Sequence, residues 1–155
     1  MRIEILILVS SWIICIFLLL KYVPVDKKRY AHITFLFSST IAWIYEYLQV
    51  ILGLVEFPFR EFEVASKMSF SLHYFVYPTF CVFFILFYPL EKGKLRIIVH
   101  FLLNSIAIST YTLFIEKYSS LIDYLKWNWF SSVLSNLILF YVIKKFVFWF
   151  KKGLV

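Results

Sequence analysis

The chain has 155 residues, of which 63% are hydrophobic, 23% are aromatic and only 16% are charged. A soluble domain of this size cannot bury so much apolar surface and would expose larger apolar patches than soluble monomers tolerate. The formal net charge of +7 is compatible with nucleic-acid binding, but the basic residues lie at the ends of apolar runs and form no continuous face. The composition therefore predicts an integral membrane protein and argues against a nucleic-acid partner.

Five apolar runs, separated by short charged breaks, account for nearly the whole chain. About 20 apolar residues at about 1.5 Å rise per residue cross a hydrocarbon core of ~30 Å as a helix. We therefore expect an all-α fold in which residues 1–155 form a single domain, a polytopic bundle of five transmembrane helices. The expected spans are 4–23, 33–55, 70–90, 95–115 and 127 to about 143.

The sequence contains no spacing typical of a zinc, P-loop, Rossmann or haem-attachment site, so no metal or cofactor is expected. Cys15 and Cys81 both fall within predicted spans, where packing is a better explanation than a disulfide. The first apolar run is followed by no small-residue cleavage pattern and by the stronger basic cluster. We expect it to remain a helix rather than a cleaved signal peptide.

Basic residues are distributed unequally between the two sides of the predicted bundle, eleven on one side and five on the other. Because Lys and Arg in short loops favour the cytoplasm, we expect the N-terminus outside and the C-terminus inside. The larger set is Lys21, Lys27, Lys28, Arg29, Lys92, Lys94, Arg96, Lys144, Lys145, Lys151 and Lys152, and the smaller set is Arg2, Arg60, Lys67, Lys117 and Lys126.

Glu46 is the clearest polar residue within a span, because it falls near the middle of 33–55. An ionisable side chain near the bilayer midplane costs ~2.5 to 3.5 kcal/mol on insertion scales, so it should face protein. Helical spacing places it on one small and polar stripe with Ser39, Ala42, Gln49 and Gly53. A functional Glu46 would bind a proton, a cation or a ligand amine. The alternative is a neutral carboxyl that holds helices together.

His73 and Tyr77 lie four residues apart on the third predicted span and so share a face. Pro78 removes one backbone donor and should kink this helix, which leaves the carbonyl of Tyr74 free. Two interpretations of His73 stay open: a site residue, or a hydrogen-bonded residue at a helix interface. No second His or Cys lies nearby in the sequence to complete a metal site.

Asn128, Ser132 and Asn136 form a polar ladder at i, i+4 and i+8 on the fifth predicted span. The ladder is explained either by helix packing through small and amide side chains or by the polar wall of a pocket. Trp127 and Trp129 are expected to anchor the outer end of this span as aromatic belt residues. We expect a short surface helix over 119–126 and a membrane-anchoring end over 144–152.

With these residues in view, the chain resembles an uncharacterised family of small five-helix integral membrane proteins from spore-forming bacteria. The resemblance covers roughly residues 33–145 and is carried by Tyr77-Pro78, Pro89 with the basic turn after it, Glu116, the Trp127-Asn128 pair and the ladder. It implies a multi-pass protein of a bacterial plasma membrane. It implies no known activity.

The first functional hypothesis is a non-enzymatic bundle that binds a small molecule or lipid in its outer half, or an accessory subunit that docks on a membrane partner or a second copy. The alternative is an intramembrane enzyme that acts on a lipid or isoprenoid, with Glu46 and His73 as acid and base. Acid-base work needs both groups within ~2.6 to 3.2 Å of the reacting atoms, and the two can lie a helical turn or more apart in depth. A proton-coupled transporter is less favoured, because the chain has no inverted repeat.

The candidate site is expected in the outer half of the bundle. Glu46 should find a polar partner on the fifth helix or in Tyr77, while His73, Tyr77, Asn128 and Ser132 should converge on one polar cavity. The predicted ligand-binding residues are Glu46, Gln49, His73, Tyr77, Asn128, Ser132 and Asn136.

Overall fold

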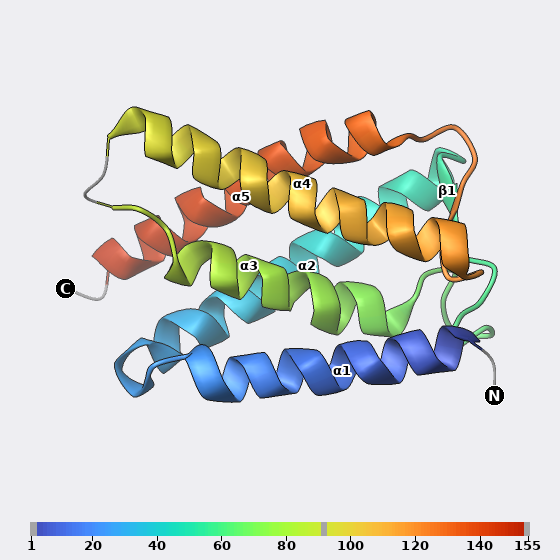
Figure 1. Ribbon diagram of the computed structural model, residues 1–155, viewed down its shortest axis with the longest axis horizontal. Coiled ribbons are helices and arrows are strands. Elements are labelled where there is room, and N and C mark those ends of the chain that lie inside the picture. The colour runs from blue at the N-terminus through green and yellow to red at the C-terminus, as the bar shows by residue number, and fades with distance from the viewer. Residues whose placement is uncertain (1–2, 91–92, 154–155) are drawn as a thin grey trace.

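The computed structural model describes residues 3–90 and 93–153 and confirms an all-α fold. Its five helices lie side by side, and consecutive helices run in opposite directions (Figure 1). A 3-10 turn, η1 (Val25–Lys27), joins the first two helices, and a π-helical segment, η2 (Leu72–Val76), leads into the third. The helices are α1 (Ile3–Tyr22), α2 (Lys28–Ile51), α3 (Tyr77–Leu86), α4 (Lys94–Tyr118) and α5 (Trp129–Lys152).

Three of the described helices, α1, α4 and α5, are long and apolar enough to cross a membrane. Large apolar side chains cover the outside of the bundle, and on α1 Leu20 is 81% exposed. Only lipid or another apolar partner can cover such a surface at low cost. The helix that follows residue 71, Leu72–Leu86, is apolar but shorter, and α2 carries a row of buried polar residues. The helix 72–86 and α2 lie in the interior of the bundle, since α2 packs against both α3 and α5.

The ends of α2 differ from the predicted span of 33–55. The helix begins at Lys28, directly after the 3-10 turn in which the N–H of Lys27 donates to the carbonyl of Pro24 at 3.0 Å. It ends at Ile51 because Gly53 adopts a left-handed conformation with φ of 62°. The N–H of Gly53 then donates to the carbonyl of Val50 at 3.1 Å, and that of Leu54 to Gln49 at 2.9 Å. These two bonds satisfy carbonyls that the helix end leaves free.

The helix α5 extends beyond the predicted end of the fifth span near residue 143 and continues to Lys152. No Gly or Pro interrupts the sequence before Gly153, so nothing forces the helix to stop earlier. The lysines of the last turns have stems long enough to place their charges beyond the apolar layer. The basic and aromatic stretch 144–152 is therefore a continuation of the helix, and its membrane-anchoring role stays a prediction.

Segment 119–126 does not form the predicted surface helix. It contributes strand β2 (Asp123–Tyr124), which pairs antiparallel with β1 (Val55–Glu56) so that Val55 faces Tyr124. The apolar residues of the two connecting segments are buried against the bundle rather than laid on a membrane surface; they are Val55, Phe57, Met68, Leu121 and Ile122. Together these residues close one end of the bundle, and we refer to them as the end cap.

Candidate functional site

The polar stripe of α2 faces the interior of the protein, as its helical spacing predicts. Ser39, Ala42, Glu46 and Gln49 are all buried. Gly53, the fifth predicted member, lies beyond the end of the helix. The stripe thus presents one carboxyl and one amide group to the neighbouring helices, at a depth where each needs a partner.

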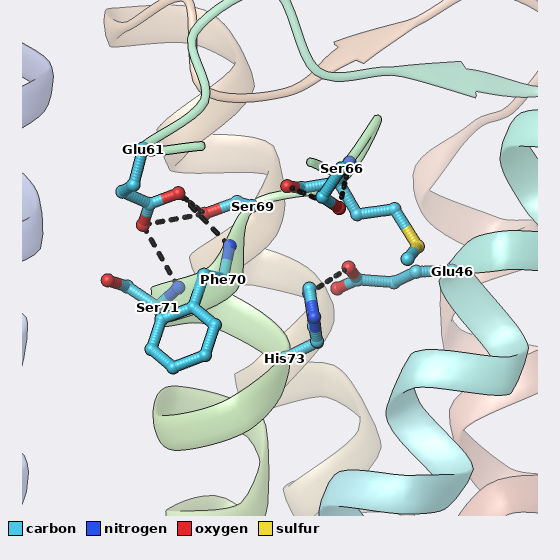
Figure 2. Close-up of polar contacts among 8 residues, drawn as sticks. Glu46, Glu61, Ser66, Ser69, Phe70, Ser71 and His73 are labelled. Atoms are coloured by element: carbon cyan, nitrogen blue, oxygen red, sulfur yellow. Dashed lines mark hydrogen bonds and ion pairs between the residues drawn. The ribbon is translucent and has the colours of Figure 1, made fainter. Parts of the chain in front are cut away.

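Glu46 contacts His73, with 2.9 Å between Oε2 of the carboxyl group and Nδ1 of the ring (Figure 2). Only 2% of each side chain is exposed. The two groups form an ion pair if His73 is protonated. Oε1 has no hydrogen-bond partner among the described residues, so the contact with His73 satisfies only one side of the carboxyl group. The burial of Glu46 is as predicted, whereas its expected partner, Tyr77 or the fifth helix, is corrected to His73.

The contact also corrects the expectation that Glu46 and His73 can lie a helical turn or more apart in depth. His73 belongs to η2, where the wider winding of the π-helix alters the register of the side chains before Pro78. Oγ of Ser39 donates to the carbonyl of Phe35 at 2.9 Å, and the carbonyl of Tyr74, predicted to be free because of Pro78, lies 3.4 Å from the same hydroxyl as the weaker acceptor of a shared hydrogen bond. This bond joins η2 to α2 on the same stripe that carries Glu46.

Glu61 fixes the start of the third helix from outside the bundle (Figure 2). Its carboxylate accepts hydrogen bonds from the backbone N–H of Phe70 at 3.0 Å and of Ser71 at 2.9 Å, and from the Ser69 hydroxyl at 3.3 Å. Partial burial acts to raise the pKa of Glu61, but the hydrogen bonds from Ser71 and Phe70 outweigh it and lower the pKa. The charge also lies at a helix N-terminus, where an anion is favoured. Glu61 thereby positions the segment that carries His73.

A cavity of about 60 Å³, the central cavity, lies between α2, α3, α4, α5 and the end cap. This volume holds roughly four or five water-sized groups. The walls combine apolar and aromatic surface with a limited number of polar side chains. Its polar and Trp lining residues are Ser38, Tyr45, Glu46, Gln49, Tyr77, Thr112, Tyr124, Trp127, Ser132 and Asn136.

The structure brings five of the seven predicted site residues to this cavity: Glu46, Gln49, Tyr77, Ser132 and Asn136. The other two do not line it. His73 reaches the site only through its contact with Glu46.

Asn128 is a correction to the predicted site. It is exposed and caps α5, where its Oδ1 accepts a hydrogen bond from the N–H of Ser131 at 2.8 Å. Asn directly before a helix start strongly favours this capping role. The predicted convergence of His73, Tyr77, Asn128 and Ser132 on one cavity therefore fails for Asn128 and is indirect for His73.

Three aromatic residues that were not among the predicted site residues also line the cavity: Tyr45, Tyr124 and Trp127. Trp127 lines the cavity, and its indole N–H donates to Oγ of Ser132 at 2.8 Å. Tyr124 reaches the site through the β1–β2 pairing, and its hydroxyl donates to Thr112 at 3.0 Å. Nothing in the sequence around Tyr124 signals that pairing. Tyr45 directly precedes Glu46, so its place on a buried helix was a usable signal.

Comparison with models of known protein families, with curated proteins and with solved structures finds no match for this chain. The resemblance to five-helix proteins of spore-forming bacteria stays a prediction.

Proposed function

We propose that this is a non-enzymatic membrane protein that binds a small molecule in the central cavity. The observation that carries the proposal is Glu46, a buried carboxyl group at the cavity whose Oε2 contacts His73 and whose Oε1 has no hydrogen-bond partner among the described residues. Leaving an ionisable group unsatisfied in an apolar interior is costly, and such residues at membrane depth usually serve function. A ligand in the cavity would supply the missing partner.

The proposed setting is a bundle in which all five helices cross the membrane. The 24 residues of α2 extend over about 36 Å at 1.5 Å per residue, which suffices for a hydrocarbon core of ~30 Å. The helix that ends at Leu86 is shorter, and the end cap lies over its outer end. Because consecutive helices alternate in direction (Figure 1), the described basic residues of the larger set gather at one end. Arg2, Glu91 and Lys92 lie outside the described residues.

We propose that this basic end is cytoplasmic, that the end cap is outside and that lipids are the immediate partners of the exposed helices. Single cysteines at Lys94 and at the exposed Glu63, in a background where Cys15 and Cys81 are replaced by Ala, test the orientation. An impermeant thiol reagent applied to intact cells should label position 63 and spare position 94. Labelling of position 94 would overturn the orientation.

A matched pair of alanine substitutions tests ligand binding. Ala42→Phe places a ring in the wall of the central cavity, whereas Ala107→Phe adds the same ring on an exposed face of α4. Native mass spectrometry of each protein released from nanodiscs would detect a retained small molecule. We expect the original chain and Ala107→Phe to keep the molecule and Ala42→Phe to lose it. Equal retention by all three proteins would refute binding in this cavity.

The 2.9 Å contact between His73 and Glu46 favours one second candidate, an intramembrane enzyme that uses the pair as acid and base on a lipid or isoprenoid. The two groups are close enough to exchange a proton, although His73 can act on a bound molecule only through Glu46. Incubation of the protein with membrane lipid extract, followed by lipid mass spectrometry, tests this function. A new product that is lost in both Glu46→Gln and His73→Gln would favour the enzyme. No product change would favour the binding protein.

A further inference from the structure

We infer that the central cavity selects a small ligand with a primary ammonium group, whether a free alkylamine or the amine of a lipid headgroup. The inference rests on the proposed function and names the chemical class of the ligand. It is carried by the charge, the hydrogen-bonding capacity and the aromatic content of the cavity walls.

The charge of the walls favours a cation. Glu46 is the only acidic residue among the described lining residues, and no Lys or Arg is among them. An anionic ligand would therefore meet a carboxyl group and no compensating cation. His73 contacts Oε2 of this carboxyl group; when His73 is neutral, a positively charged ligand bound at Oε1 would supply the opposite charge that makes a buried carboxylate tolerable.

The hydrogen-bonding groups favour a ligand that donates. The amide of Gln49 donates to the Tyr45 hydroxyl at 3.1 Å, and that of Asn136 to the Ser109 hydroxyl at 3.0 Å. Each amide then keeps its carbonyl oxygen and one N–H hydrogen. The hydroxyls of Ser38 and Tyr77 in the lining can likewise donate or accept. Oε1 of Glu46 has no hydrogen-bond partner among the described residues, and an ionised carboxyl group can only accept, so a ligand bound at this oxygen must donate. A primary ammonium has three donors and no acceptor, as the Lys side chain illustrates.

The aromatic walls favour an ammonium over a hydrated inorganic ion. Tyr45, Tyr77, Tyr124 and Trp127 line the cavity, and a cation near such rings is stabilised by their quadrupoles. The polar ends of three rings are held by the protein, since Tyr45 bonds Ser135, and Tyr124 and Trp127 bond Ser132. No group of three or more His, Cys, Asp or Glu that could hold a metal ion occurs within residues 3–90 and 93–153.

The cavity volume sets the size of the probe. Space for roughly four or five water-sized groups accommodates about five non-hydrogen atoms. n-Butylammonium has this size and is charged at neutral pH, and n-butanol is an uncharged ligand of the same length. Binding of both probes to the full chain in phosphatidylcholine nanodiscs would be measured by ligand-observed NMR. Nanodiscs with added phosphatidylethanolamine would show whether an aminolipid competes.

Three variants make the test specific. Glu46→Gln removes the acidic group while keeping its shape, and Glu63→Gln makes the same change at an exposed position outside the cavity. Gln49→Glu adds a second carboxyl to the wall and keeps the proposal testable if Glu46→Gln fails to fold.

We expect n-butylammonium to bind more tightly than n-butanol, and Glu46→Gln to weaken its binding by about 10- to 100-fold, as loss of a charged hydrogen bond does. Glu63→Gln should leave binding unchanged, and Gln49→Glu should strengthen it. Competition by phosphatidylethanolamine would identify a lipid headgroup as the source of the ammonium group. No competition would identify a free amine.

Equal binding of the two probes, with no effect of Glu46→Gln or Gln49→Glu, would overturn the ammonium assignment and leave the proposed binding function standing. Binding of neither probe, together with no retained molecule in native mass spectrometry, would overturn both.

Discussion

The contact between Glu46 and His73 predicts strong energetic coupling between α2 and the third helix. If His73 is protonated, a pair of opposite unit charges at 2.9 Å gains about 6 kcal/mol of Coulomb energy at an effective dielectric constant of 20. Removing one member of a buried pair typically costs about 3 to 5 kcal/mol, because the other charge stays buried without compensation. Replacing both members with apolar residues often costs much less.

A double-mutant cycle measures this coupling. The variants are Glu46→Leu, His73→Leu and the double substitution, and the free energy of unfolding would be measured in bicelles by steric trapping. Each single substitution should destabilise by about 3 kcal/mol or more, and the double should recover at least about 2 kcal/mol of the summed loss. Neutral hydrogen bonds between membrane helices couple by only about 0.6 kcal/mol on average and at most about 1.7. A coupling in that lower range would identify a neutral contact, and a coupling near zero would refute the pair.

Three further substitutions test the elements around the site. Hydrogen bonds lower the pKa of Glu61 in the folded protein. Its contribution to stability should therefore be present above the unfolded pKa of about 4.3 and be lost as the pH falls through the lower folded pKa. Glu61→Gln should remove this pH dependence of thermal unfolding between neutral and acidic pH. Asn128→Ala should destabilise α5 by about 1 kcal/mol by chemical denaturation, and a loss below about 0.3 kcal/mol would argue against the cap. Ser39→Ala should cost about 0.6 kcal/mol and increase hydrogen exchange over 72–76, because the Tyr74 carbonyl loses the hydroxyl that it shares with Phe35; unchanged exchange would contradict this role.

The helices and the buried stripe of α2 are predictable because they depend on local periodicity. An apolar run of sufficient length forms a helix in any arrangement of its neighbours, and helical spacing alone places Glu46 and Gln49 on one face. Pro78 similarly signals a disturbed helix, and the structure adds that the disturbance is π-helical and that Ser39 compensates the Tyr74 carbonyl.

The partner of Glu46 could not be predicted, because it depends on which helices are neighbours and on the register that η2 gives to His73. Depth was estimated with a uniform rise per residue, and a π-helical segment violates that assumption. The end cap was missed for a related reason. Leu121 and Ile122 follow a pattern that suits a surface helix as well as a buried loop, and only the pairing of β1 with β2 distinguishes the two.

The central claim, a ligand held at Glu46 inside a membrane bundle, is tested most directly by an electron cryo-microscopy map of the protein purified in nanodiscs from its native membrane. At a resolution that shows ordered solvent, the account predicts connected density for a small molecule in the central cavity, within hydrogen-bonding distance of a Glu46 carboxylate oxygen and bounded by Gln49, Tyr77 and Ser132. A cavity that has collapsed onto Glu46, or a Glu46 side chain that points into lipid, would contradict it.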